Sequence, residues 1–167
     1  MPNPGVTLRA PQVADAASIW KLLPEVGNLE RNSAYAYLLL CSHFAATSLV
    51  AVCEREIAGF VLAYRPPTEP TSLFVWQVGV APAARGEGLG TRMLDGVLAL
   101  PGCKGVSHLT ATVSPDNLPS LALFRGYARR RGVACELGRG YPATLFPAPH
   151  PDEDLLRIGP LVQKGRT

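Results

Sequence analysis

Residues 77–90, QVGVAPAARGEGLG, place one cation and three glycines directly after a strand-like segment. Arg85 carries a planar set of N–H donors that suits phosphate. Gly86, Gly88 and Gly90 allow successive backbone N–H groups to turn toward one point, and the helix expected to follow adds its positive N-terminal end. The stretch therefore predicts a loop that binds a pyrophosphate.

Two other phosphate-binding motifs fit this loop poorly. A P-loop has a lysine and a hydroxyl residue after its last glycines, and Leu89-Gly90-Thr91 contains no lysine. The order G-E-G-L-G-T also differs from the G-x-G-x-x-G of dinucleotide-binding folds, and no acidic residue follows where a ribose would be held. A plain strand-to-helix turn is the remaining alternative, but such a turn requires one glycine rather than three.

Length and composition indicate one folded domain over residues 1–167, with 47% hydrophobic residues. No uncharged apolar run of 18 residues and no signal-peptide pattern occur, so we expect a cytoplasmic protein without a membrane partner. The net charge of +3 is small. The basic run Arg125–Arg131 is expected to be a solvated helix face, and nucleic-acid binding is the weaker alternative.

The four cysteines are widely spaced and lie in apolar stretches, without any C-x-x-C pair. They are Cys41, Cys53, Cys103 and Cys135. We expect four buried thiols rather than a disulfide framework or a metal site.

The elements that must position the glycine loop alternate between strand and helix patterns. Strands are expected over residues 6–11, 48–54, 56–65, 73–80, 106–113 and 133–137. Helices are expected over 15–25, 32–47, 88–100 and 116–132, with Asp15 capping the first and Asp116 or Asn117 the last. Residues 138–167 are rich in proline and glycine and show no clear pattern. This order predicts an α/β (α+β) domain with a mixed central sheet flanked by helices.

The motif Arg85-x-x-Gly88-x-Gly90, after a strand that ends in Val78-x-Val80, resembles the acetyl-CoA motif of the GNAT-type N-acetyltransferases. The resemblance implies the GNAT fold and acetyl-CoA as the cosubstrate. It also implies that the strand ending at Val80 splays from the strand at residues 109–113. The pantetheine arm of CoA would then pair with the backbone of Val78 and Val80.

Residues 112–124, TVSPDNLPSLALF, resemble the second half of the same fold. In that fold an asparagine at a helix start lies beside the CoA arm, and Asn117 occupies its place. Asn117 could equally be a plain helix cap, or serve both roles.

Longer stretches resemble one family of this superfamily, the L-2,4-diaminobutyrate acetyltransferases of ectoine biosynthesis. They are NSAYAYLLLCSHFAATSLVA (32–51), residues 59–90, TVSPDN (112–117) and DEDLLRIGP (152–160). The resemblance implies transfer of an acetyl group from acetyl-CoA to the γ-amino group of L-2,4-diaminobutyrate, by a homodimer.

This substrate carries an α-carboxylate, an α-ammonium group and the reactive γ-amine, so its site needs acids, hydrogen-bond donors and an apolar wall. The resemblance places substrate contacts at Glu30, Asn32, Tyr35, Trp76 and Thr112, and proton carriers at His150 and Glu153. Without the resemblance, these aromatic residues would be assigned to the core, and Glu30 and Asn32 to a helix cap.

Three positions depart from the family pattern. Glu30 stands where the family has aspartate, and Thr110-Ala111-Thr112 stands where it has E-T-T. Phe124 occupies the place of the tyrosine that protonates the leaving thiolate in many GNAT enzymes. The sequence therefore leaves the general acid open among Glu153, His150 and water.

Two further functions remain open from the sequence. One is a GNAT enzyme for another small primary amine, which would share the CoA loop. The other is a CoA-binding sensor without catalysis, which Phe124 would explain.

Overall fold

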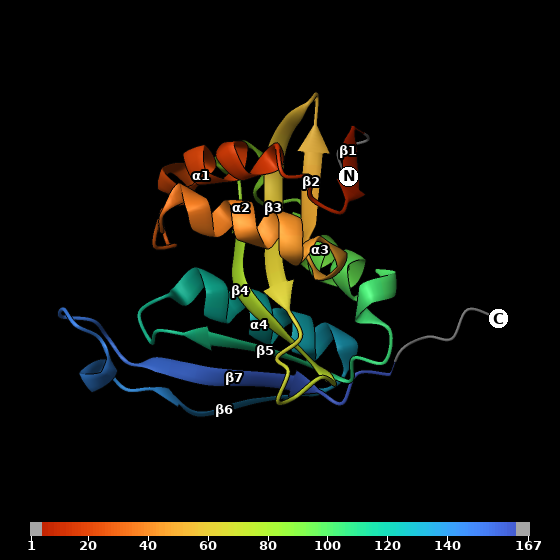
Figure 1. Cartoon of the computed structure of the whole chain (residues 1–167). Coiled ribbons are helices and arrows are strands. Elements are labelled where there is room, and N and C mark those ends of the chain that lie inside the picture. The colour runs from red at the N-terminus through yellow and green to blue at the C-terminus, as the bar shows by residue number, and fades with distance from the viewer. Residues whose placement is uncertain (1–4, 163–167) are drawn as a thin grey trace. The chain divides into compact units, whose positions relative to one another are not determined.

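The computed structural model describes residues 5–162 of the chain (Figure 1). Its contacts divide the chain into two compact units. Unit 1 is Met1–Tyr64 with Trp76–Lys104, and unit 2 is Arg65–Val75 with Gly105–Thr167. The boundary falls within a strand, β4 (Ser72–Val80), which contributes residues to both units.

Each unit combines strands and helices. Besides the second half of β4, unit 1 holds β1 (Val6–Arg9), α1 (Asp15–Val26), α2 (Ala34–His43), β2 (Leu49–Cys53), β3 (Glu56–Tyr64) and α3 (Leu89–Leu98). Besides the first half of β4, unit 2 holds β5 (His108–Val113), α4 (Leu118–Arg131), β6 (Ala134–Tyr141) and β7 (Glu153–Gly159).

The strands form a mixed sheet. Strands β1, β2 and β3 pair antiparallel, β4 pairs in parallel with β5, and β7 pairs antiparallel with both β5 and β6. The hydrogen-bonded order is β1-β2-β3-β4-β5-β7-β6. Parallel and antiparallel pairs in one sheet with flanking helices confirm the predicted α/β class.

In unit 1, neighbouring residues of β3 show which helices cover each face. Phe60 is fully buried in a cluster with residues of α1 and α2, which lie side by side in Figure 1. A Cβ at Gly59 would lie 2.9 Å from Cε of Met93 on α3. Because successive residues of a strand point to opposite faces, α1 and α2 pack on one face of β3 and α3 on the other.

In unit 2, α4 packs against β6 and β7. Its residues Phe124 and Tyr127 are buried. The loop before β4 is fastened to β7, because the guanidinium of Arg157 donates to the carboxylate of Glu69 and, at 3.4 Å, to the hydroxyl of Ser72. Hydrogen bonding to Arg157 lowers the pKa of Glu69 below its usual value.

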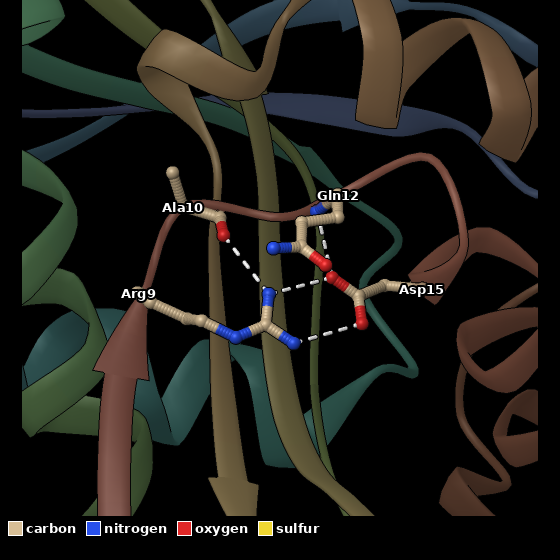
Figure 2. A network of polar contacts seen from close by, with 4 residues as sticks. All are labelled: Arg9, Ala10, Gln12 and Asp15. Carbon is tan, nitrogen blue, oxygen red and sulfur yellow. Dashed lines mark hydrogen bonds and ion pairs between the residues drawn. The ribbon is translucent and has the colours of Figure 1, made fainter.

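The prediction that Asp15 caps α1 was wrong. Helix α1 begins at Asp15, with Ala14 at the cap position and no side-chain cap hydrogen bond. The Asp15 carboxylate instead accepts two hydrogen bonds from the Arg9 guanidinium, at 2.7 and 2.9 Å, and one from the N–H of Gln12 at 2.7 Å (Figure 2). Asp15 thus joins β1 to the start of α1.

Most predicted elements are present with shorter bounds, and one strand was missed. Asn117, rather than Asp116, caps α4 by accepting a hydrogen bond from the N–H of Ser120 at 3.3 Å. Strand β7 (Glu153–Gly159) lies in the region that the sequence left without a pattern.

All four cysteines are free thiols. Cys41 and Cys103 are buried as expected, but Cys53 and Cys135 are only half-buried, so the prediction was wrong for these two. Across residues 5–162, no helix combines the length and the apolar character that crossing a membrane requires.

Candidate active site

The glycine loop lies between β4 and α3 in unit 1. Gly86 and Gly88 have φ angles of +81° and +69°, which non-glycine residues rarely adopt. A Cβ at either position would meet no heavy atom within 4 Å, so backbone conformation rather than space requires glycine here. Gly90 lies in the first turn of α3, where backbone N–H groups have no partner within the helix. The loop has the conformation and the free approach that an anion needs.

Arg85 makes contacts that the sequence did not predict. Its Nη2 donates to the carbonyl of Val26 at 2.8 Å and to that of Glu25 at 3.3 Å, and its Nε donates to the carbonyl of Val80 at 3.4 Å. The first two carbonyls belong to the C-terminal end of α1, where a cation is stabilising. Arg85 therefore ties the glycine loop to α1, and its contact with a phosphate stays a prediction.

Four predicted substrate residues lie in unit 1. Glu30 and Asn32 are exposed on the loop between α1 and α2. Tyr35, in the first turn of α2, is 67% exposed, so it is no core residue. Trp76 is half-buried and its ring packs on that of Tyr37, with 5.6 Å between the ring centroids.

Two buried residues with polar groups, neither of them a predicted site residue, lie next to this group. The Tyr37 hydroxyl donates to Oε1 of Gln77 at 3.0 Å, and Nε2 of Gln77 donates to the carbonyl of Glu30 at 2.8 Å. The N–H of Asn32 donates to the Tyr37 hydroxyl at 3.4 Å. A glutamine inside the otherwise apolar strand FVWQV was the signal that could have identified Gln77.

Unit 2 contains three other predicted positions. Thr112 is half-buried on β5, opposite Leu155 of β7. Asn117 is the cap of α4, and Phe124 is buried on the same helix. Phe124 has no proton to donate, and Tyr127, the next hydroxyl-bearing residue on this helix, is fully buried.

The segment between β6 and β7 carries the two predicted proton carriers. The imidazole of His150 stacks on the ring of Phe146, with 3.8 Å between centroids and 8° between planes. Its Nδ1 lies 2.7 Å from the carbonyl of Pro151. Because a carbonyl only accepts, Nδ1 is the donor in this contact. Glu153 is half-buried at the start of β7, opposite Tyr141.

Two of the four thiols are less acidic than an ordinary cysteine. Burial raises the pKa of Cys41 to about 11, and the nearby Asp15 adds to this shift. Burial also raises the pKa of Cys135. Because the thiolate is the reactive form, neither residue is suited to carry an acetyl group. Residues 5–162 contain no group of three His, Cys, Asp or Glu side chains that could hold a metal ion.

Comparison with known proteins reveals close relatives over nearly the whole chain. The sequence profile of the Acetyltransferase (GNAT) family matches residues 16–127. The L-2,4-diaminobutyric acid acetyltransferase of Nocardia farcinica is 44% identical over 159 residues, which cover 95% of this chain and 82% of the relative. That of Bordetella parapertussis is 47% identical over 155 residues, covering 92% of this chain and 83% of the relative.

A solved structure agrees in fold as well as in sequence. It is that of diaminobutyrate acetyltransferase EctA from Paenibacillus lautus, in complex with its substrate L-2,4-diaminobutyric acid and coenzyme A. The match has a TM-score of 0.89 at 39% identity and covers 96% of this chain and 98% of that one. The chain therefore belongs to the acetyltransferase (GNAT) family and, within it, to the diaminobutyrate acetyltransferases, as its sequence motifs predicted.

Proposed function

We propose that this protein transfers the acetyl group of acetyl-CoA to the γ-amino group of L-2,4-diaminobutyrate, giving N4-acetyl-L-2,4-diaminobutyrate in ectoine biosynthesis. One observation carries the proposal. The Paenibacillus lautus enzyme, whose structure holds both diaminobutyric acid and coenzyme A, matches 96% of this chain at a TM-score of 0.89.

The proposed cosubstrate site uses the backbone more than side chains. Its residues are Val78, Val80, Arg85, Gly86, Gly88, Gly90 and Asn117. The positive φ angles of Gly86 and Gly88 and the N-terminal end of α3 support pyrophosphate binding there. The residues of β4 that pair with β5 are Ser72–Phe74, and Val78 and Val80 follow later on the strand, where the pantetheine arm would bond as an added strand does.

The proposed amine site combines acids, amides and an aromatic wall. Glu30 would attract the ammonium groups, and Asn32, Tyr35 and Thr112 would hydrogen-bond the polar end of the substrate. The half-buried ring of Trp76 supplies apolar surface for the acetyl group. The exposure of Glu30, Asn32 and Tyr35 supports their availability to a ligand.

Proton removal is the main chemical cost of the reaction. An amine like that of lysine has a pKa of about 10.4, so freeing its lone pair at pH 7 costs roughly 4–5 kcal/mol. The neutral γ-nitrogen then attacks the thioester carbon and a C–N bond forms. As the C–S bond breaks, the proton that the attacking nitrogen must lose is passed to the sulfur, and CoA leaves as a thiol. A backbone N–H near residues 78–80 would stabilise the oxyanion. We assign proton transfer to His150 and Glu153, because imidazole and carboxylate side chains are the groups that most often act as general acids and bases.

An assay of thiol release tests the proposed function. Acetyl-CoA is offered with 2,4-diaminobutyrate, ornithine, lysine, putrescine or a short peptide as the acceptor. We expect saturable turnover with diaminobutyrate well above that with the others. Preference for another amine would contradict the substrate assignment, and acetyl-CoA binding without turnover on any amine would indicate a sensor instead.

A pair of variants tests the assignment of Glu153. Glu153→Gln should lower kcat about 10²-fold or more, the scale of a general acid–base contribution. The neighbouring Asp154→Asn, on the same strand, should leave kcat within about twofold. An unchanged kcat/KM in Glu153→Gln would remove Glu153 from the site.

Three broader properties belong to the same proposal. We infer one catalytic domain over residues 1–167, supported by a family match that takes in residues of both units. Four free thiols and the use of acetyl-CoA support a cytoplasmic location. A homodimer is supported by the exposed Leu137 and Tyr141 on β6, which ends the strand order, and light scattering of the purified protein tests it.

A further inference from the structure

Two buried polar side chains lie against the loop between α1 and α2, residues 27–33, which carries Glu30 and Asn32. Tyr37 is 0% exposed and Gln77 is 6% exposed. Burial of a phenol and an amide among apolar residues is unfavourable unless both find hydrogen-bond partners. Their partners are each other and backbone groups of the loop.

The chemistry of these groups allows one orientation of the hydrogen bonds. The carbonyl of Glu30 only accepts, so the amide nitrogen of Gln77 faces it at 2.8 Å. The amide oxygen of Gln77 then faces Tyr37, whose hydroxyl donates to it at 3.0 Å. The same hydroxyl accepts the N–H of Asn32 at 3.4 Å. This series of hydrogen bonds thus begins and ends on backbone groups of the loop. Neither the Gln77 amide nor the Tyr37 hydroxyl can therefore reverse its orientation without losing a bond.

Helix α1 holds the same loop from another side. Nε1 of Trp20 donates to the carbonyl of Asn32 at 3.0 Å, and the guanidinium of Arg31 lies 3.9 Å from the centre of the Trp20 ring. Within the loop, Nδ2 of Asn32 donates to the carbonyl of Glu30 at 3.3 Å. Glu30 and Asn32, two of the four proposed substrate residues of unit 1, are therefore fixed at their backbones, while their side chains remain exposed.

Tyr37 also contacts Trp76, another proposed substrate residue of unit 1. Its ring packs on that of Trp76, with planes tilted by 43°. One buried side chain thus contacts Trp76 through its ring and Asn32 through its hydroxyl. A change in the position of Tyr37 would move both together.

We propose that Tyr37 and Gln77 are positioning residues for the amine substrate, holding loop 27–33 and Trp76 in the arrangement that binds it. The inference rests on the proposed function and adds two residues that do not themselves touch the substrate. Holding exposed side chains in place before binding lowers the entropy lost when the ligand binds. Loss of the hydrogen bonds should therefore weaken binding of the amine and leave binding of acetyl-CoA, at the glycine loop, unchanged.

Two single variants and one control separate this role from general support of the fold. Tyr37→Phe removes the hydroxyl and keeps the ring, and Gln77→Met keeps the length of the side chain and removes its polar atoms. Tyr64→Phe, at the end of β3, makes the same deletion where the ring packs on Phe44 instead. Each of the first two changes should raise KM for diaminobutyrate about 5- to 10-fold, the scale of one lost hydrogen bond. KM for acetyl-CoA should stay within about twofold in all variants.

The double variant tests whether the two residues act as one unit. Because Tyr37 and Gln77 share a hydrogen bond, combining the changes should raise KM for diaminobutyrate less than the product of the two single effects. Independent, multiplicative effects would overturn the proposed linkage. Equal rises in both KM values, or a similar loss in Tyr64→Phe, would show general structural damage and overturn the inference.

Amide hydrogen exchange of residues 28–33, measured without ligand, gives a readout that does not depend on activity. We expect faster exchange in Tyr37→Phe and Gln77→Met than in the wild type and Tyr64→Phe. Unchanged exchange, or faster exchange with an unchanged KM for the amine, would overturn the inference. If the wild-type enzyme does not acetylate diaminobutyrate, the proposed function is refuted instead. The KM values of the variants are then compared for the amine that the wild type does acetylate.

Discussion

The ion pair between Arg9 and Asp15 gives a stability prediction that can be worked out from its geometry. Three hydrogen bonds end on the Asp15 carboxylate, two from Arg9 and one from the N–H of Gln12, all between 2.7 and 2.9 Å (Figure 2). The change Asp15→Asn keeps the shape of the side chain but turns one oxygen into an N–H donor that faces other donors. It therefore removes the charge and at least one of the three bonds.

The expected loss is about 2 kcal/mol. A hydrogen bond to a charged group contributes about 1.5–3 kcal/mol. The Asp15 side chain is 11% exposed, but that of Arg9 is 35% exposed, so solvent screening reduces the part contributed by Arg9 toward about 1 kcal/mol. For a chain of 167 residues, 2 kcal/mol corresponds to a fall in Tm of roughly 4–8 °C.

The same pair makes the difference depend on pH. Hydrogen bonding to Arg9 holds the pKa of Asp15 below its usual value. A carboxyl group with a lowered pKa in the folded state stabilises the fold above its unfolded pKa of about 4, and this contribution disappears as the pH falls through the folded pKa. The gap between wild type and Asp15→Asn should therefore be full at pH 7 and shrink below about pH 4.

Urea unfolding followed by circular dichroism, at a series of pH values from 7 down to 3, measures this gap. Asp116→Asn, at an exposed carboxylate before α4, is the matched control and should change the free energy of unfolding by less than about 0.5 kcal/mol. A gap for Asp15→Asn that is below about 0.5 kcal/mol at pH 7, or that stays constant down to pH 3, would refute the reasoning.

Three other changes follow from local geometry. Gly79→Ala should destabilise the protein by about 1–3 kcal/mol in thermal unfolding, because its Cβ would lie 2.7 Å from Cζ of the buried Phe60; an unchanged Tm would contradict this packing. Gly88→Ala should lower Tm and raise KM for acetyl-CoA several-fold, because φ at this position of the glycine loop is +69°. Gly105→Ala, at φ +82° outside the loop, should lower Tm by about as much as Gly88→Ala does but leave KM for acetyl-CoA unchanged. Cys41 should resist iodoacetamide at pH 7.5 in the native state and react after unfolding, as mass spectrometry can show; native labelling would contradict its burial and its pKa of about 11.

Features that depend on neighbours in the chain were predictable from the sequence. The glycine loop is one, because the glycines and the following helix are contiguous. The tight turn between β2 and β3 is another, and its residues Glu54 and Arg55 adopt positive φ angles. Asn117 as the cap of α4 follows from the same kind of local rule.

Features that depend on distant partners were not predictable. The sequence around Asp15 is typical of a helix cap, but in the structure its carboxylate accepts hydrogen bonds from the guanidinium of Arg9 on β1. Strand β7 pairs with β5 and β6, and its short, mixed sequence gives little signal without them. The hydrogen bonds of Gln77 to Tyr37 and Glu30 join residues 40 and 47 positions apart, which no local pattern records.

The position of the acetyl group on the product tests the central claim most directly. Acetyl-CoA labelled with ¹³C in the acetyl group is incubated with the enzyme and L-2,4-diaminobutyrate, and the product is examined by NMR. The account predicts a single amide at the γ-nitrogen, with the α-amine left free. Acetylation at the α-nitrogen, a mixture of both amides, or no labelled product would contradict it.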